Sequence, residues 1–142
     1  MNLENLQDMW KTDSVIDPDK YGEESVRIPQ LHMRYMEFFN TFSLMKKDRE
    51  SEMRMVVRDK WIYYKGKSPA SVYKEMPFDL KLTTNDEIKM FIAADDEVRK
   101  LQLKIDYIEQ TIFFLDGVLR RINSRNYQIK NAIEWERFQS GM

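Results

Sequence analysis

The clearest pattern in the sequence is a run of apolar positions in the C-terminal third that recur every three or four residues. Such a repeat predicts a long helix with a continuous apolar seam. Asp95 precedes the run and is a suitable cap, so the helix is expected to begin near it. The seam consists of Val98, Leu101, Ile105, Ile108, Ile112, Leu115, Leu119, Ile122, Ile129 and Ile133. Asn126 falls in phase with the seam and predicts either a register-setting core position or a break between two helices.

The same helix carries a second apolar edge, which consists of Leu103, Tyr107, Phe113, Phe114 and Val118. One partner helix cannot cover both edges, and a seam left in water would forfeit roughly 1.5 to 3 kcal/mol per large side chain. The pattern therefore predicts packing within the chain on one edge and self-association on the other. A purely intramolecular core is the alternative. The seam residues are the predicted oligomerisation surface.

A second long helix is predicted to begin near Pro29, because proline suits the first turn of a helix. It continues to about Tyr64, where Gly66 is expected to end it. Its apolar positions fall on one side of a helical wheel and are Leu31, Tyr35, Phe38, Phe42, Met45, Val56 and Tyr63.

The N-terminal segment is predicted to be a short helical arm. The helix should run from Leu3 to Lys11 with Asn2 as its cap. Residues 13–25 are acidic and contain a proline and a glycine, so they are expected to form a linker with at most one helical turn. Such an arm either serves as a docking element or folds back on its own core.

The segment between the two long helices is predicted to be largely irregular. Residues 68–82 contain two prolines, which favours a crossover without regular structure. Thr84 and Glu87 then have the spacing of a capping box, which predicts a short helix through Phe91.

The composition agrees with an all-α fold. One third of the 142 residues are charged, and glycine and proline number only four each, as is typical of long helices with solvated faces. There is no cysteine, which excludes disulfides and thiolate chemistry. The sequence shows neither a signal peptide nor an apolar run long enough to span a membrane, so a soluble protein inside the cell is expected.

The residues that common catalytic sites require are missing from the sequence. No glycine-rich phosphate loop occurs, and His32 is the only histidine, so a serine triad and a carboxylate-bridged metal pair have no support. His32 is predicted to be a structural or surface residue. We therefore predict no enzyme, no metal and no cofactor.

The net charge of −1 conceals a basic block at residues 43–75, which holds nine basic and five acidic side chains. In the predicted helix, four of the cations lie within about 20° of a common line opposite the apolar side. Cations beside an aromatic ring favour a single nucleic-acid strand, because they neutralise phosphates while the ring stacks on a base. The DNA-binding candidates are Lys47, Arg54, Arg58, Lys60, Trp61, Lys65 and Lys67.

Two points weigh against this interpretation. Any amphipathic helix has a polar side, and Trp61 is equally suited to the boundary of a core. Lys60 projects roughly 200° away from Arg58, towards the apolar side. If both residues bind a strand, Lys60 should snorkel around the helix edge or lie at a contact between subunits.

Short matches to one protein family occur along the chain in a shared order and spacing. They are Leu3-Glu4-Asn5-Leu6-Gln7, Ile16-Asp17, Tyr63-Tyr64, Gly66, Ala94-Asp95, Val98, Gly117, Leu119, Ile122, Ser124-Arg125 and Ile129-Lys130. Through these residues the chain resembles, nearly end to end, the UvsY family of recombination mediators of T4-type phages.

The resemblance implies a helical protein that assembles through its C-terminal region into a ring-like homo-oligomer, a hexamer or a heptamer. It also implies binding of single-stranded DNA in recombination, repair and replication. The implied partners are a RecA-like phage recombinase and the phage single-strand-binding protein. The mediator would load the recombinase onto strands that the single-strand-binding protein covers. The implied location is the cytoplasm of the infected bacterial host, and no catalysis is involved.

The family's DNA-binding motif maps onto two basic residues, Arg58 and Lys60. This sequence departs from the motif because Asp59 replaces a small spacer, the two basic types are exchanged, and Ile62 stands where an acidic residue is usual. Positive charge is kept at both positions, so binding is still expected.

These observations predict an all-α mediator with two functional regions. Residues 1–92 are expected to carry the DNA-binding helix, and residues 93–142 to carry the oligomerisation helix. The alternative is an oligomeric helical scaffold or adaptor that uses the same seam and does not bind DNA.

Overall fold

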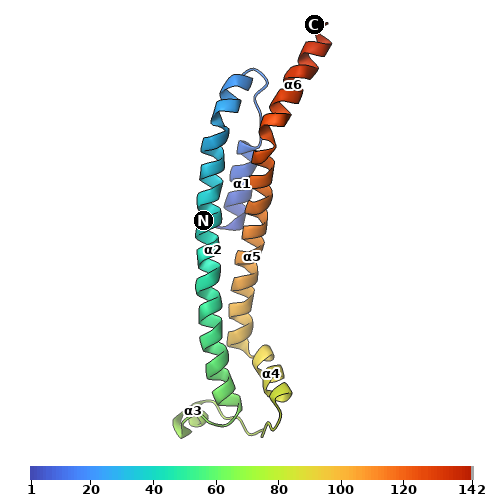
Figure 1. Ribbon diagram of the computed structural model, residues 1–142. Coiled ribbons are helices and arrows are strands. Elements are labelled where there is room, and N and C mark those ends of the chain that lie inside the picture. Colours follow the sequence, from blue (N-terminus) through green and yellow to red (C-terminus); the bar gives the residue numbers. More distant parts are fainter. Residues whose placement is uncertain (142) are drawn as a thin grey trace. The chain divides into compact units, whose positions relative to one another are not determined.

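The computed structural model describes residues 1–141, and every regular element within them is a helix (Figure 1). The helices are α1 (Leu3–Asp13), α2 (Tyr21–Tyr64), α3 (Ala70–Glu75), α4 (Asn85–Ala94), α5 (Asp96–Asn123) and α6 (Arg125–Gln139). The predicted all-α fold class is confirmed. No helix of the described chain is both long and apolar enough to cross a membrane.

The chain divides into two compact units. The first comprises Met1–Ser43 and the described residues from Glu109 onwards, and the second comprises Leu44–Ile108. This division reflects packing, whereas the predicted division into residues 1–92 and 93–142 concerns function. The functional division therefore stays a prediction.

Helix α1 belongs to the core of the first unit. Its predicted cap is confirmed, because the Asn2 side chain accepts a hydrogen bond of 2.8 Å from the backbone N–H of Asn5. Leu6 is fully buried, and the Trp10 ring meets the edge of Tyr35 with ring centroids 5.5 Å apart. The arm thus folds back on its own unit.

A buried carboxylate joins the end of α1 to α2. Asp13 is 5% exposed and accepts hydrogen bonds from Arg27 at 2.8 Å, Arg34 at 3.2 Å and the Tyr35 hydroxyl at 2.9 Å. Burial and the bond to Asp13 raise the pKa of Tyr35 above its ordinary value. The carboxylate is thus fully partnered, as a buried charge must be.

Helix α2 begins at Tyr21, so the predicted start near Pro29 was wrong. Ion pairs with residues of other helices favour the earlier start. Glu24 pairs with Arg125 of α6, and Arg27 pairs with Asp13 of α1, both at 2.8 Å. These ion pairs stabilise the first turns of α2, although Pro29 lies inside the helix and lacks the N–H of an interior residue.

The seam of α5 and α6 is almost entirely buried within the chain. Its buried members are Val98, Leu101, Ile105, Ile108, Leu115, Leu119, Ile122 and Ile129, whereas Ile112 and Ile133 are half-buried. The seam therefore supplies the cores of the two units, as the intramolecular alternative predicts. Its role as an interface between copies stays a prediction, and it would require these side chains to leave the core.

The second apolar edge of α5 is the more exposed of the two. Phe113 is 72% exposed, Leu103 is 66% exposed and Tyr107 is 46% exposed. Phe114 is half-buried and Val118 is buried. Three of the five side chains on this edge thus leave large apolar areas in water.

The C-terminal seam is interrupted at Ser124, so α5 and α6 are two helices. The Ser124 hydroxyl donates a 3.0 Å hydrogen bond to the carbonyl of Arg121, a local bond that competes with the helical ladder. Asn126 is exposed, so of its two predicted roles the core position is wrong and the break between two helices is confirmed. The break lies just before it.

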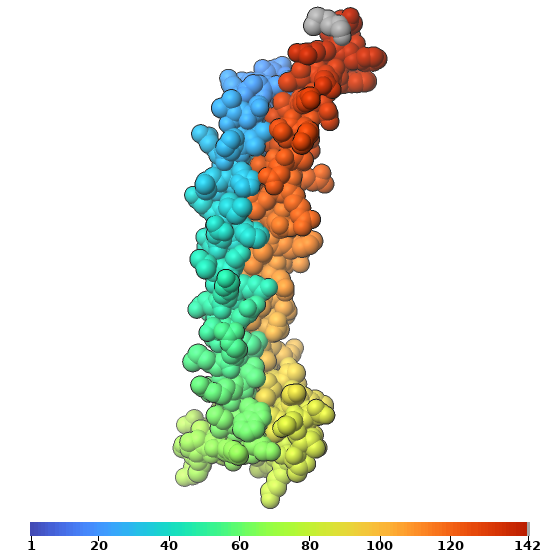
Figure 2. All heavy atoms as spheres, in the orientation of Figure 1, coloured from blue at the N-terminus to red at the C-terminus, as the bar shows by residue number. Residues whose placement is uncertain are grey.

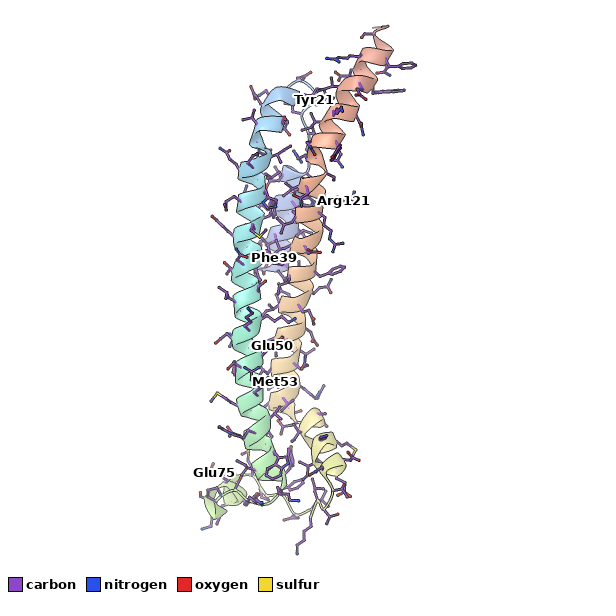
Figure 3. All side chains as sticks on the ribbon, in the orientation of Figure 1. Tyr21, Phe39, Glu50, Met53, Glu75 and Arg121 are labelled. Carbon is purple, nitrogen blue, oxygen red and sulfur yellow. The ribbon has the colours of Figure 1, made fainter. Side chains whose placement is uncertain are left out.

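The core of the second unit is built from α2, α4 and the start of α5. Ile88, Ile92 and Val98 are buried together, with Met53 of α2 packed against them. Figure 3 marks the position of Met53 on α2. Asp95 caps α5 as predicted, because its side chain accepts hydrogen bonds from the N–H groups of Glu97 at 3.0 Å and Val98 at 3.3 Å.

The segment before α4 is more regular than predicted, because residues 70–75 form α3. The Tyr73 hydroxyl donates to the carbonyl of Tyr63 at 2.7 Å, which ties this helix to the end of α2. Thr84 caps α4 as expected, accepting from the N–H of Glu87 at 3.2 Å. The Glu87 carboxylate accepts in return from Thr83, and α4 extends past Phe91 to Ala94.

Candidate nucleic-acid interface

A row of cations lies along the part of α2 that belongs to the second unit and continues into the residue just after the helix. Lys47, Arg54 and Arg58 are exposed and Lys65 is half-buried. We call these four residues the cationic face. Within residues 1–141, Lys47, Arg54 and Lys65 have no ion-pair partner, so their charges are available to an anion.

The fourth member, Arg58, is paired only weakly. Its guanidinium donates two hydrogen bonds, of 3.2 and 3.1 Å, to one oxygen of the neighbouring Asp59. Both side chains are 64% exposed, and exposed pairs of this kind contribute about 0 to 1 kcal/mol. A phosphate can therefore compete with Asp59 for the guanidinium at little cost.

The chain reversal after α2 brings a further cation to Trp61. Gly66 has φ of +83°, a backbone conformation that favours glycine, and it ends α2 as predicted. The N–H of Lys67 then donates to the carbonyl of Ile62 at 3.0 Å, and that of Gly66 donates to Tyr63 at 3.1 Å. This pair of bonds is a Schellman motif, which folds the chain back along the helix end.

As a result, the Lys67 ammonium lies 5.5 Å from the centre of the Trp61 ring, which is a cation–π contact. Trp61 is 37% exposed, so part of the ring remains accessible beside the cation. Both residues were predicted from the sequence, but their contact was not. The glycine two positions after Tyr64 was the signal from which it could have been found.

An aromatic cluster fixes the end of α2 from the other side. Tyr63 stacks on Tyr73 with ring centroids 5.3 Å apart, and Tyr64 lies edge-on to Phe78 at 5.0 Å. Phe91 of α4 meets Phe78 at 5.6 Å. These rings hold the backbone that carries Trp61 and the neighbouring cations, so the interface is preorganised.

Lys60 lies apart from the cationic face, inside a network of carboxylates. Its ammonium is 3.4 Å from Asp95 and 3.1 Å from Glu97, and its side chain is only 17% exposed. Burial works to lower the pKa of Lys60, but the bonds to Glu97 and Asp95 outweigh burial and raise it. Lys60 thus pairs within its own chain, and the two placements expected for a strand-binding Lys60 stay predictions.

Asp95 is the centre of this network. The Tyr64 hydroxyl donates a 2.7 Å hydrogen bond to it. Burial works to raise the pKa of Asp95, but that bond, the N–H groups of α5 and Lys60 together hold the pKa below its ordinary value. The pKa of Asp95 is therefore lower in the folded than in the unfolded state, so the ionised carboxylate stabilises the fold. This contribution is complete above the ordinary pKa and is lost as the pH falls through the folded-state pKa.

Replacing Lys60 with methionine should therefore lower stability and leave strand binding largely intact. The variant leaves Asp95 without its ammonium partner, and we expect the free energy of unfolding to fall by about 1 to 3 kcal/mol. Urea unfolding measures the change in stability, and a salt titration of oligonucleotide binding measures any change in strand binding. A variant as stable as the wild type with a much shallower salt dependence would instead place Lys60 on the strand.

The interface offers phosphate neutralisation and base stacking, which do not discriminate between base sequences. Within residues 1–141 no three histidine, cysteine or carboxylate side chains cluster in a way that could hold a metal ion. His32 lies half-buried on α2 in the first unit, whereas the candidate interface belongs to the second.

Comparisons with known proteins agree along nearly the whole chain. Residues 9–142 match the family described as "Recombination, repair and ssDNA binding protein UvsY". Recombination protein uvsY of Enterobacteria phage T4 is 27% identical over 144 residues, covering 99% of each chain. Two crystal structures of the bacteriophage T4 recombination mediator protein UvsY are similar in fold. The lattice type II structure has a TM-score of 0.85 and 24% identity, covering 99% of this chain and 98% of that one. The lattice type IV structure has a TM-score of 0.83 and 23% identity, covering 98% and 99%.

Proposed function

The chain belongs to the UvsY family of recombination, repair and single-stranded-DNA-binding proteins, and from that membership we propose that it is a recombination mediator that binds single-stranded DNA through α2. The observation that carries the proposal is the cationic face beside Trp61. Three of its four cations have no ion-pair partner in the described chain, and the adjacent ring is partly exposed. The net charge of −1 makes this concentration of available positive charge local rather than general.

Trp61 and Lys67 complete the proposed interface. Phosphates would lie along the cationic face, and a base would stack on the accessible part of the Trp61 ring, with about 1 to 3 kcal/mol per stacked base. Lys60 was predicted to contact DNA as well. Its two carboxylate partners argue that it positions the start of α5 instead.

Self-association would strengthen a site that is weak in one copy. When several copies engage one strand, each later contact is effectively intramolecular, so the overall affinity rises without any new contact. We propose a ring-like homo-oligomer, a hexamer or a heptamer. Residues 1–92 would carry the strand and the C-terminal region from residue 93 would supply most of the surface between copies. The exposed aromatic and aliphatic side chains of α5 suit that second role.

In the proposed role the oligomer acts between two other proteins. It would bend or wrap the strand, loosen a phage single-strand-binding protein and present the strand to a RecA-like recombinase, in the cytoplasm of the infected bacterial host. Recombinase assembly on strands covered by the single-strand-binding protein should then become faster when the protein is added. An unchanged rate would contradict the mediator role while leaving strand binding in place.

Strand binding is tested by fluorescence anisotropy with a labelled oligothymidylate over a range of salt concentrations. Each phosphate contact contributes about −0.7 to the slope of log K against log salt, so four cations predict a slope near −3 per copy. A scaffold or adaptor that does not bind DNA predicts no binding at low salt. That outcome would replace the proposal with the alternative.

A further inference from the structure

The first unit has an apolar groove between α1 and α5. Its volume is about 340 Å³, and its walls include Leu3 and Trp10 from α1 and Phe113 from α5. Its floor contains Gly117, above which an added Cβ atom would meet nothing within 4 Å. Phe113 is the second most exposed large aromatic side chain of the described chain, at 72%. The groove is thus open to solvent and lined in part by aromatic rings.

The same unit carries an apolar knob at the end of α6. Trp135 and Phe138 stack with ring centroids 5.7 Å apart and an angle of 23° between the rings. They are 59% and 73% exposed, and every described residue from 134 onwards is exposed. Figure 2 shows the end of α6 extending past the start of α2, and the Tyr21 hydroxyl of α2 donates a 3.2 Å hydrogen bond to Glu136. Two stacked rings of this size in water mark a contact surface.

We infer that the groove receives the stacked Trp135 and Phe138 side chains of a second copy of this chain, so that copies join head to tail. Arg121 lies on the groove wall, and Figure 3 shows it on α5 at the level of α1. Glu134 lies beside Trp135 on the knob. Neither charge has an ion-pair partner within residues 1–141, so the two surfaces carry opposite charges that are available to each other.

The knob cannot fill the groove of its own chain. Residue 135 is 18 positions beyond residue 117, which corresponds to roughly 27 Å of helix at 1.5 Å per residue. Helix α6 leads away from α5, with only the break at Ser124 between them (Figure 1). The occupant must therefore come from another copy.

A knob and a groove on different parts of one unit produce a heterologous contact, which closes into a ring when the rotation between neighbours allows it. The inference rests on the proposed self-association and names the residues that bring it about. It also adds α1 to the surface that was predicted from residues 93–142 alone.

The groove is tested by replacing Gly117 with leucine. The side chain would fill the groove from its floor, and leucine is a better helix former than glycine, so the fold should be kept or stabilised. We expect the dissociation concentration, measured by light scattering without DNA, to rise roughly 100-fold, because hot-spot contacts of this size are lost. Gly117→Ala is the matched control and should assemble like the wild type, since a methyl group leaves most of the groove open.

The knob is tested by the double variant Trp135→Ser with Phe138→Ser, which changes only exposed side chains. It should lose assembly to the same extent. Tyr127→Ser is its control, because Tyr127 is a 65% exposed aromatic residue on the same helix and lies outside the knob. Circular dichroism and urea midpoints show whether each variant is folded.

Mixing the two defective variants distinguishes this contact from other modes of assembly. The knob variant keeps an intact groove and Gly117→Leu keeps an intact knob, so an equimolar mixture should form a dimer and grow no further. Two defective variants that stay monomeric when mixed would overturn the head-to-tail contact. Variants that assemble like the wild type would overturn it too, but would leave self-association standing. A monomeric wild-type protein would overturn both, and the oligothymidylate titration would still report on strand binding.

Discussion

Replacing Arg54, Arg58 and Lys65 with glutamine is expected to weaken binding to a single strand on the order of 100-fold at 0.1 M salt, because about three phosphate contacts are lost. The slope of log K against log salt should become shallower by about 2 for the same reason. All three side chains lie on the cationic face, outside the cores, so the fold should remain. Anisotropy with a labelled oligothymidylate measures both quantities.

The matched control replaces three lysines that are exposed elsewhere, Lys20, Lys89 and Lys130, with glutamine. The change in net charge is identical, so any effect of overall charge is the same in both variants. We expect the control to keep most of the affinity and nearly all of the slope. Equal losses in the two triple variants would show that binding follows total charge rather than the cationic face.

Replacing Arg125 with methionine should have the largest effect on stability, about 3 to 5 kcal/mol, because it removes the 2.8 Å partner of the half-buried Glu24 carboxylate and leaves only the 3.7 Å contact with Arg27. Arg125 is 3% exposed and bonds Glu24 at 2.8 Å and the carbonyl of Val15 at 3.0 Å. It therefore holds the linker and the first turn of α2 against α6. Urea unfolding followed by circular dichroism gives the change in free energy.

Arg120 provides the comparison for this variant, since its side chain is 79% exposed and pairs with Asp116 one turn away. Arg120→Met should cost less than about 1 kcal/mol. Similar unfolding midpoints for the two variants would mean that the buried network around Arg125 contributes little to stability.

Features that depend on neighbouring residues could be predicted from the sequence. Asn2 and Asp95 cap their helices as expected, and Gly66 ends α2, because each acts on backbone groups within a few positions. The spacing of the seam likewise identified core positions such as Leu115 and Ile122, which are fully buried.

Features that depend on distant residues could not be predicted. The start of α2 was placed too late, because the pairing of Glu24 with Arg125 spans most of the chain. The placement of Lys60 depends on Asp95, which no local pattern connects to it. Periodicity also showed that α5 has two apolar edges but not which of them the chain itself covers.

The candidate interface shows the same limit. The cations and Trp61 were found from wheel geometry, which needs only a helix. Their accessibility depends on what packs nearby, and the cation–π contact between Lys67 and Trp61 depends on the chain reversal at Gly66.

We propose that a weakly cationic helical subunit becomes a strong strand-binding protein by repetition. The most direct measurement is the affinity for oligothymidylates of increasing length at one salt concentration, with the assembled mass followed by light scattering. The affinity and the magnitude of the salt slope should rise together as the strand becomes long enough to engage several copies. An affinity and a slope that are the same for the shortest and the longest strands, with the protein monomeric throughout, would contradict this proposal.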